Sequence, residues 1–200
     1  MEVLKFDWTV EEINAQIQKI ITLNKAFIDK VETIPLESCT FENVCHYLAT
    51  NDGESALVGG PIRFLQHVSS DPAIREASRN FEKSMNEFDT YVYQRSGLYE
   101  RYSHVMSDIA RELANSELVP SSNSKQSKMD SNNEINAKRD LLKVKYQYVK
   151  TMVYKFETNG AQLDEQGKAK IKNLINQRDE MELKFAENIA ETDAFLYFNE

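Results

Sequence analysis

The stretch NGAQLDEQGKAKIKNLINQRDEMELKFAENIAETDAFLYFN, residues 159–199, decides the fold because it joins a helix end, a turn and one long amphipathic helix. Gly160 suits the left-handed position that closes a helix. Asp164 suits the N-cap of the next helix, with Glu165 near its positive end. Six apolar residues then recur at helical spacing and predict one broad face built for burial: Ile171, Leu174, Ile175, Met181, Phe185 and Ile189.

Similar signals predict a long helix near the start of the chain. Thr9 and Glu12 have the spacing of a capping box, and Trp8 is placed to pack onto Ile13 or its neighbours. The periodic apolar run that follows predicts a helix up to the breaker Pro35.

Two more helices are predicted on either side of a Ser-Gly pair at residues 96–97. Asp71 is the expected cap of the first, with Pro72 at its first helical position, and this helix runs to about Arg95. The second follows the pair and ends near Ser116.

Between these regions, Thr40 begins a shorter capped segment, TFENVCHYLAT. One face of this segment is apolar and consists of Phe41, Val44, Cys45 and Leu48. The turn-forming residues 51–53 and the Gly-Gly-Pro run at 59–61 predict that the chain turns, breaks or bends there.

The Ser- and Asn-rich residues 120–133 predict a mobile loop, because they offer little apolar area to offset the entropy of ordering. A helix from Glu134 to Thr158 follows, and its short connection to the final helix predicts an antiparallel hairpin. The loop separates two helical halves rather than two independent domains, because neither half alone can bury its apolar stripes. The fold predicted is therefore all-α, a single domain over residues 1–200, as an elongated, mostly antiparallel bundle of about five to seven helices.

The composition excludes several classes of function. A formal net charge of −8 argues against nucleic acid as a partner, because phosphate binding needs clustered Lys and Arg. No apolar run approaches the ~18 residues of a membrane span, so no membrane partner is expected. The first residues lack the basic and apolar regions of a signal peptide, and the expected location is cytoplasmic.

The sequence indicates no catalytic, cofactor-binding or metal-binding residue. The HExxH motif is absent, and His46, His67 and His104 are too widely spaced for the closely paired ligands of a zinc site. Cys39 and Cys45 match no zinc or redox spacing and are interpreted as buried thiols. A GxSxG nucleophile motif is also absent.

Four tyrosines lie around the predicted joint at residues 96–97: Tyr91, Tyr93, Tyr99 and Tyr102. Such a group could line a surface for a peptide or a ligand, and Tyr91, Tyr99 and Tyr102 are the first residues to probe. The favoured interpretation is structural, with half-buried rings whose hydroxyls reach water.

Four blocks of the chain, in this order, resemble the N-terminal region of the thimet oligopeptidase, neurolysin and saccharolysin family of M3 zinc metallopeptidases. They are FDWTVEEI, TFENVCHYLA, FLQHVSSDPAIREASRNFEKSMNEFD and MVYKFETNGAQLDEQGKAKIKNL. The resemblance implies a helical module in the non-catalytic half of an enzyme that encloses short peptides in a channel. It also implies that the zinc ligands, an HExxH helix and a later glutamate, lie C-terminal to this region, so that no cofactor is expected in this chain.

Three functions stay open on the sequence alone. In the first, the chain is a truncated or fragmentary member of the family that does not hydrolyse peptides by itself. In the second, it is a standalone helical protein that binds peptides or a peptidase. In the third, it is one half of a split metallopeptidase. Its expected partners are accordingly short peptides or a catalytic peptidase chain.

Overall fold

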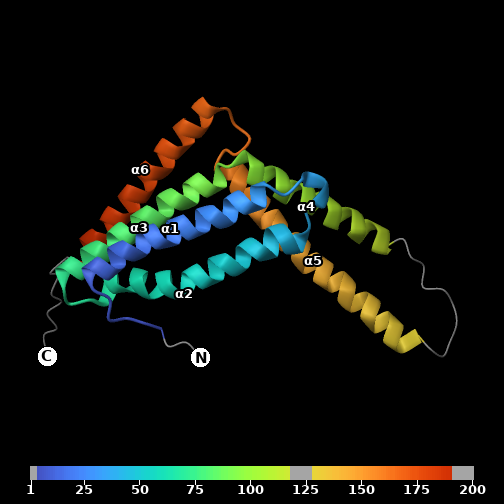
Figure 1. Cartoon of the computed structure of the whole chain (residues 1–200), viewed down its shortest axis with the longest axis horizontal. Coiled ribbons are helices and arrows are strands. Elements are labelled where there is room, and N and C mark those ends of the chain that lie inside the picture. Colours follow the sequence, from blue (N-terminus) through green and yellow to red (C-terminus); the bar gives the residue numbers. More distant parts are fainter. Residues whose placement is uncertain (1–3, 118–127, 191–200) are drawn as a thin grey trace, which may run out of the picture. The chain divides into compact units, whose positions relative to one another are not determined.

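A computed structural model describes residues 4–117 and 128–190, and within these ranges it has six α-helices and no strand (Figure 1). The prediction of an all-α fold with about five to seven helices is confirmed. The chain divides into two compact units. The first unit consists of Met1–Asn24, Gly53–Val92 and Asp164–Glu200, and the second of Lys25–Asp52 and Tyr93–Leu163.

The helices follow the order of the chain. Their bounds are Val10–Glu32 for α1, Tyr47–Val68 for α2, Pro72–Tyr93 for α3, Ser96–Glu117 for α4, Lys128–Thr158 for α5 and Glu165–Ala190 for α6. A 3-10 turn, Leu36–Ser38, and a π-helical segment, Phe41–His46, lie between α1 and α2. None of these helices, over the described residues, has the length and apolar character needed to cross a membrane.

The predicted N-terminal caps are present in the first unit. The backbone N–H of Thr9 donates to Glu12 Oε2 at 3.0 Å, and that of Glu12 donates to Thr9 Oγ1 at 3.2 Å, which completes the capping box. Asp71 Oδ1 accepts from the Ala73 N–H at 2.8 Å at the start of α3. Trp8 packs against the cluster that contains Ile13, as predicted.

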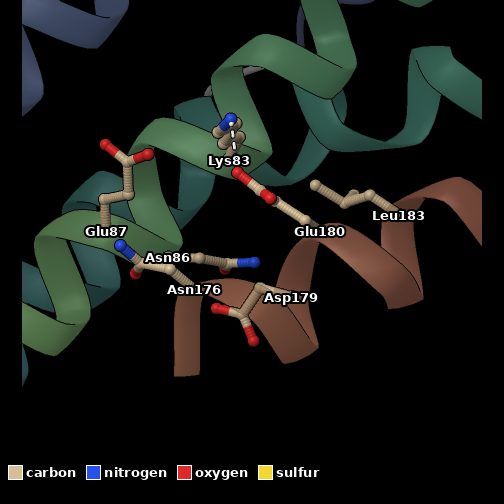
Figure 2. Close-up of a pocket in the computed structure, with 7 residues that line it drawn as sticks. All are labelled: Lys83, Asn86, Glu87, Asn176, Asp179, Glu180 and Leu183. Carbon is tan, nitrogen blue, oxygen red and sulfur yellow. Dashed lines mark hydrogen bonds and ion pairs between the residues drawn. The ribbon is translucent and has the colours of Figure 1, made fainter. Parts of the chain in front are cut away.

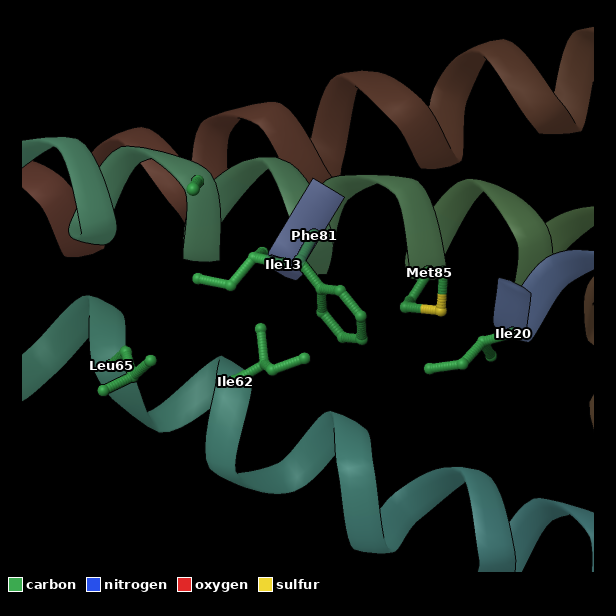
Figure 3. Packing of buried hydrophobic residues seen from close by; sticks show 7 residues of the cluster. Ile13, Ile20, Ile62, Leu65, Phe81 and Met85 are labelled. Carbon is green, nitrogen blue, oxygen red and sulfur yellow. The ribbon is translucent and has the colours of Figure 1, made fainter. Parts of the chain in front are cut away.

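The core of the first unit is formed by α1, α2 and α3 (Figure 3). Its buried residues are Ile13, Ile20, Ile62, Leu65, Ala77, Phe81 and Met85. Ser78 is fully buried and fastens α3 to α2, because its hydroxyl donates to Ile62 O at 2.6 Å and accepts from Gln66 N–H at 3.1 Å. This pair of bonds satisfies the hydroxyl within an apolar region.

The predicted break at residues 51–53 and 59–61 is wrong, because α2 continues through both. A Cβ at Gly59 would lie 3.3 Å from Phe81 Cζ, so the glycine permits close approach of this ring. Pro61 lies inside the helix, at a cost of about 3 kcal/mol. Burial of Ile62 and Leu65 offsets this cost, since each contributes roughly 1.5–3 kcal/mol.

The second unit is built on α4 and α5, which run antiparallel. Ser96 Oγ donates to Ala161 O at 3.0 Å near one end of the pair, and Arg139 Nη2 donates to Ser116 O at 2.6 Å near the other. The buried residues along the two helices are Leu98, Tyr102, Val105, Ile109, Leu142, Val149, Val153 and Phe156. Thr40 caps the segment before α2 in a reciprocal pair with Asn43.

Two arginines bind the end of α1 within the second unit: Arg95, just before α4, and Arg101, within α4. Arg95 pairs with the Glu32 carboxylate and lies 3.0 Å from Asp29 Oδ1. Arg101 donates to the backbone carbonyls of Glu32 and Ile34, the latter at 2.8 Å from Nη2. The last carbonyls of a helix have no partner within it, so Arg101 satisfies a carbonyl of α1, that of Glu32, which would otherwise require water.

The turn after α5 forms as the sequence predicts. Gly160 has a φ of 82°, the Gly160 N–H donates to Glu157 O at 3.0 Å, and the Ala161 N–H donates to Phe156 O at 3.0 Å. These two bonds define a Schellman motif. Asp164 Oδ1 then accepts from Gly167 N–H at 2.8 Å and caps α6.

One expectation about the second half of the chain needs correction. Part of the predicted loop at 120–133 lies outside the described residues, but residues 128–133 are helical because α5 begins at Lys128. The predicted hairpin joins α5, which packs along α4 in the second unit, to α6, which packs along α3 in the first unit, and it stays a prediction. The apolar residues 195–198 lie outside the described residues. The rest of the mobile loop and the single domain also stay predictions.

Replacing Gly160 by alanine tests the left-handed turn. We expect Gly160→Ala to lower the free energy of unfolding by roughly 1–2 kcal/mol, because a Cβ disfavours this backbone conformation. Gly53→Ala is the matched control, since Gly53 is helical and an added methyl group would meet open space, and it should raise stability by roughly 0.5–1 kcal/mol. Urea unfolding measures the free energy of unfolding of both variants. Equal stability of wild type and Gly160→Ala would contradict the assignment.

Candidate functional site

Three of the four tyrosines singled out in the sequence surround Phe156 in the second unit. The ring centroids of Tyr93, Tyr99 and Tyr102 lie 5.3, 6.4 and 5.3 Å from that of Phe156. Such distances are typical of packed aromatic side chains. Phe156 is 1% exposed, so the cluster is part of the core rather than the lining of an open surface.

Tyr99 and Tyr91 have separate environments. The Tyr99 hydroxyl donates to Glu157 Oε1 at 3.3 Å and accepts from Gln162 Nε2, which ties the end of α5 to α4 within the second unit. Tyr91 belongs to the first unit and stacks on Phe88 at 5.9 Å. Both contacts agree with the structural interpretation of these tyrosines.

Tyr102 differs from the expectation of a half-buried ring with a wet hydroxyl, because it is only 1% exposed. Its hydroxyl is hydrogen-bonded to that of Tyr148. Burial raises the pKa of both tyrosines and of Cys45, and the nearby Cys45 thiol raises the pKa of the two tyrosines further. Water therefore has little access to this part of the second unit.

Both cysteines are buried and free, as predicted. Burial raises the pKa of the Cys39 thiol, although the Arg101 charge opposes this shift. Because a thiolate is the reactive form, the two protonated thiols have no feature of a nucleophilic or metal-binding cysteine.

The histidines do not come together as a zinc site. His46 and His67 are exposed, and His104 Nε2 lies 3.4 Å from Asp108 Oδ2 on the same helix. Within residues 4–117 and 128–190, no three His, Cys, Asp or Glu side chains form a group that could hold a metal ion. The described residues therefore do not fit a catalytic zinc site, which uses three protein ligands.

A small polar pocket lies between α3 and α6 in the first unit (Figure 2). Its lining residues are Lys83, Asn86, Glu87, Asn176, Asp179, Glu180 and Leu183. Lys83 Nζ lies 3.2 Å from Glu180 Oε1 across the pocket. Asp179 is 9% exposed and accepts from its neighbour Arg178 at 2.6 and 2.9 Å, and this hydrogen bond raises the pKa of Arg178.

The size and charges of this pocket favour helix packing over ligand binding. Its cavity volume is about 10 Å³, far below the roughly 300–1,000 Å³ of typical ligand sites. The Lys83–Glu180 pair is about half exposed on both sides, and such pairs contribute roughly 0.2–1 kcal/mol. Its polar groups therefore serve mainly to hold α6 beside α3.

The apolar face predicted for burial on α6 is largely exposed, which corrects the sequence interpretation. Leu174, Met181, Phe185 and Ile189 are 55, 66, 68 and 63% exposed, while Ile171 and Ile175 are half-buried. The side of α6 against α3 is polar instead, with Glu187 Oε1 3.5 Å from Arg79 Nη2. Periodicity correctly marked one apolar face but gave no information about what covers it.

Sequence reasoning missed two features of these sites. Phe156 was one of many apolar helix residues, and only the fold makes it the centre of the aromatic cluster. Asp179 lies among other charged helix residues, and no local signal in the sequence distinguishes its burial from the exposure of Glu180 and Glu182.

Comparisons with known proteins identify relatives among peptidases. No family model matches the chain. It is 24% identical over 196 residues to the thimet-like oligopeptidase of Dictyostelium discoideum, covering 98% of this chain and 26% of that protein. It is 24% identical over 193 residues to saccharolysin of Saccharomyces cerevisiae, and this match covers 96% of this chain and 23% of saccharolysin. A shorter match is to oligopeptidase A of Escherichia coli, which is 35% identical over 63 residues. This match covers 32% of this chain and 9% of oligopeptidase A.

The matches confirm the resemblance found in the sequence: this all-helical chain is related to the M3 oligopeptidase family, at the level of its N-terminal region. The chain spans about a quarter of the length of the two relatives that it matches over nearly all of its own length.

The buried thiol of Cys45 predicts a pH dependence of stability. Its pKa is raised in the folded state, so the unfolded chain loses this proton first as the pH rises above the ordinary value of 9.0. The free energy of unfolding should therefore fall above about pH 9, by up to about 1.4 kcal/mol per pH unit from this group. Urea unfolding at about pH 8 and about pH 10 measures this fall, which should be smaller in Cys45→Ala.

Val149→Ala is the control for that comparison. Val149 is fully buried in the same unit and does not titrate, so its truncation should lower stability without changing the pH dependence. The same slope in Cys45→Ala as in wild type would show that Cys45 ionises equally in both states.

Proposed function

We propose that the chain is the non-catalytic, N-terminal helical module of an M3-type oligopeptidase and does not hydrolyse peptides by itself. The observation that supports this most strongly is the unequal coverage of the matches. The Dictyostelium relative aligns with 98% of this chain, yet only 26% of the relative takes part. About three quarters of that enzyme therefore lies outside the similarity.

The chemistry of the chain agrees with this proposal. The sequence has no HExxH motif, and the described residues do not fit a zinc site. The tyrosines that could have bound peptide are used in packing, around Phe156 or against Phe88. In the proposed enzyme the remaining polypeptide supplies zinc and the reacting groups, while this chain helps to enclose short peptides and acts in the cytoplasm.

A second candidate is a separate helical protein that docks on a peptidase chain, either as a regulator or as one half of a split metallopeptidase. The exposed apolar face of α6 favours this candidate, because an isolated module with such a face has a surface available for a partner. Co-purification from cells with a chain that contains HExxH would favour it over the first.

The purified chain tests the proposal directly. With added zinc and a fluorescence-quenched short peptide, we expect no hydrolysis above the rate without protein, because no group among the described residues supports metal-assisted attack by water. Metal analysis of the same sample should find no stoichiometric zinc. The Dictyostelium relative serves as the positive control, and turnover by the isolated chain that a chelator removes would refute the proposal.

A further inference from the structure

The outer face of α6 is an apolar surface that no element covers among the described residues of the first unit. It consists of Leu174, Met181, Phe185 and Ile189, each more than half exposed. At about 100° per residue these four side chains fall within about 80° of one another, in a stripe about 22 Å long. Apolar stripes of this kind on a helix are normally buried against a second element.

The opposite side of α6 already has its partner. Asn176, Leu183 and Glu187 project roughly opposite to the stripe on a helix of this period, and the first two line the pocket against α3. Glu187 and Glu180 face Arg79 and Lys83 of α3. These contacts orient the polar side of α6 toward α3, so the apolar side faces away from α3.

The charge and the size of this surface argue against a second copy of the chain as the occupant. Each copy has a net charge of −8, so two copies repel. Four half-exposed side chains offer on the order of 400 Å², about half of the ~800 Å² per partner of a standard stable interface. A larger polypeptide that extends beyond the stripe can reach the area that a stable interface needs.

The relatives contain such a polypeptide. The chain matches them over 98% and 96% of its length, and about three quarters of each relative lies outside the match. We propose that the outer face of α6 is the surface on which this remaining part of an M3-type oligopeptidase packs, with Met181 and Phe185 at the centre of the interface. This inference rests on the proposed function, because it names the partner of the module.

A binding experiment tests the interface. The part of the Dictyostelium oligopeptidase outside the matched region is produced as a separate protein and titrated into the fluorescently labelled 200-residue chain. The double variant Met181→Gln and Phe185→Gln should bind at least about tenfold more weakly than wild type, because both side chains are large, apolar and central. Glutamine preserves helix propensity, so circular dichroism of the variant should match that of wild type.

Leu57→Gln is the matched control. Leu57 lies on α2 of the same unit and is 54% exposed, so it tests whether any exposed apolar residue has the same effect. It should bind as wild type does. If the enzyme fragment does not fold alone, it is co-expressed with the tagged chain. Sedimentation of the purified complex then compares binding by wild type and the variants.

Each result decides between the proposals. The proposed interface would be overturned if wild type and the double variant bound equally, or if Leu57→Gln weakened binding as much as the double variant does. It would also be overturned if wild type formed no complex in either experiment. The proposal would also be overturned if the wild-type chain self-associated and the double variant did not, because the occupant of the α6 face would then be a second copy. Hydrolysis by the isolated chain would refute the proposed function and leave the interface intact.

Discussion

The left-handed turn at Gly160 is the constraint on which the second half of the structure depends. Phe156 and Ala161 are buried on either side of this turn, where their backbone groups bond to each other. The turn thereby fixes the end of α5 and holds Phe156 at the centre of the aromatic cluster. A short distance further along the chain Asp164 caps α6, which packs along α3 in the first unit.

Local signals in the sequence predicted the ends of most helices, because a cap depends on residues only a few positions apart. Thr9 with Glu12, Asp71 and Gly160 all form the predicted bonds. The breakers in α2 misled the prediction because tertiary packing overrides propensity. Pro61 and Gly59 are tolerated inside a helix whose neighbours Ile62 and Leu65 are buried, and no local pattern conveys this burial.

The candidate sites were less predictable than the fold. The sequence grouped Tyr93, Tyr99 and Tyr102 correctly but not around Phe156, and it expected a wet hydroxyl where Tyr102 is fully buried. The apolar face of α6 was recognised from its period, whereas the polar contacts of the other face with α3 join residues about 100 positions apart in the chain, which no local pattern conveys. A helix of this kind, polar toward its own unit and apolar outward, agrees with the proposed role of the chain as a module of a larger enzyme.

Exchange of a domain shows most plainly whether this chain is an oligopeptidase module. In the Dictyostelium thimet-like oligopeptidase, the region matched here is replaced by this chain, and peptide hydrolysis is compared with that of the intact enzyme and of an enzyme from which the region is deleted. We expect the exchanged enzyme to hydrolyse short peptides and the deleted enzyme to be inactive. A folded, zinc-loaded exchanged enzyme that is as inactive as the deleted one would contradict the assignment of the chain as such a module.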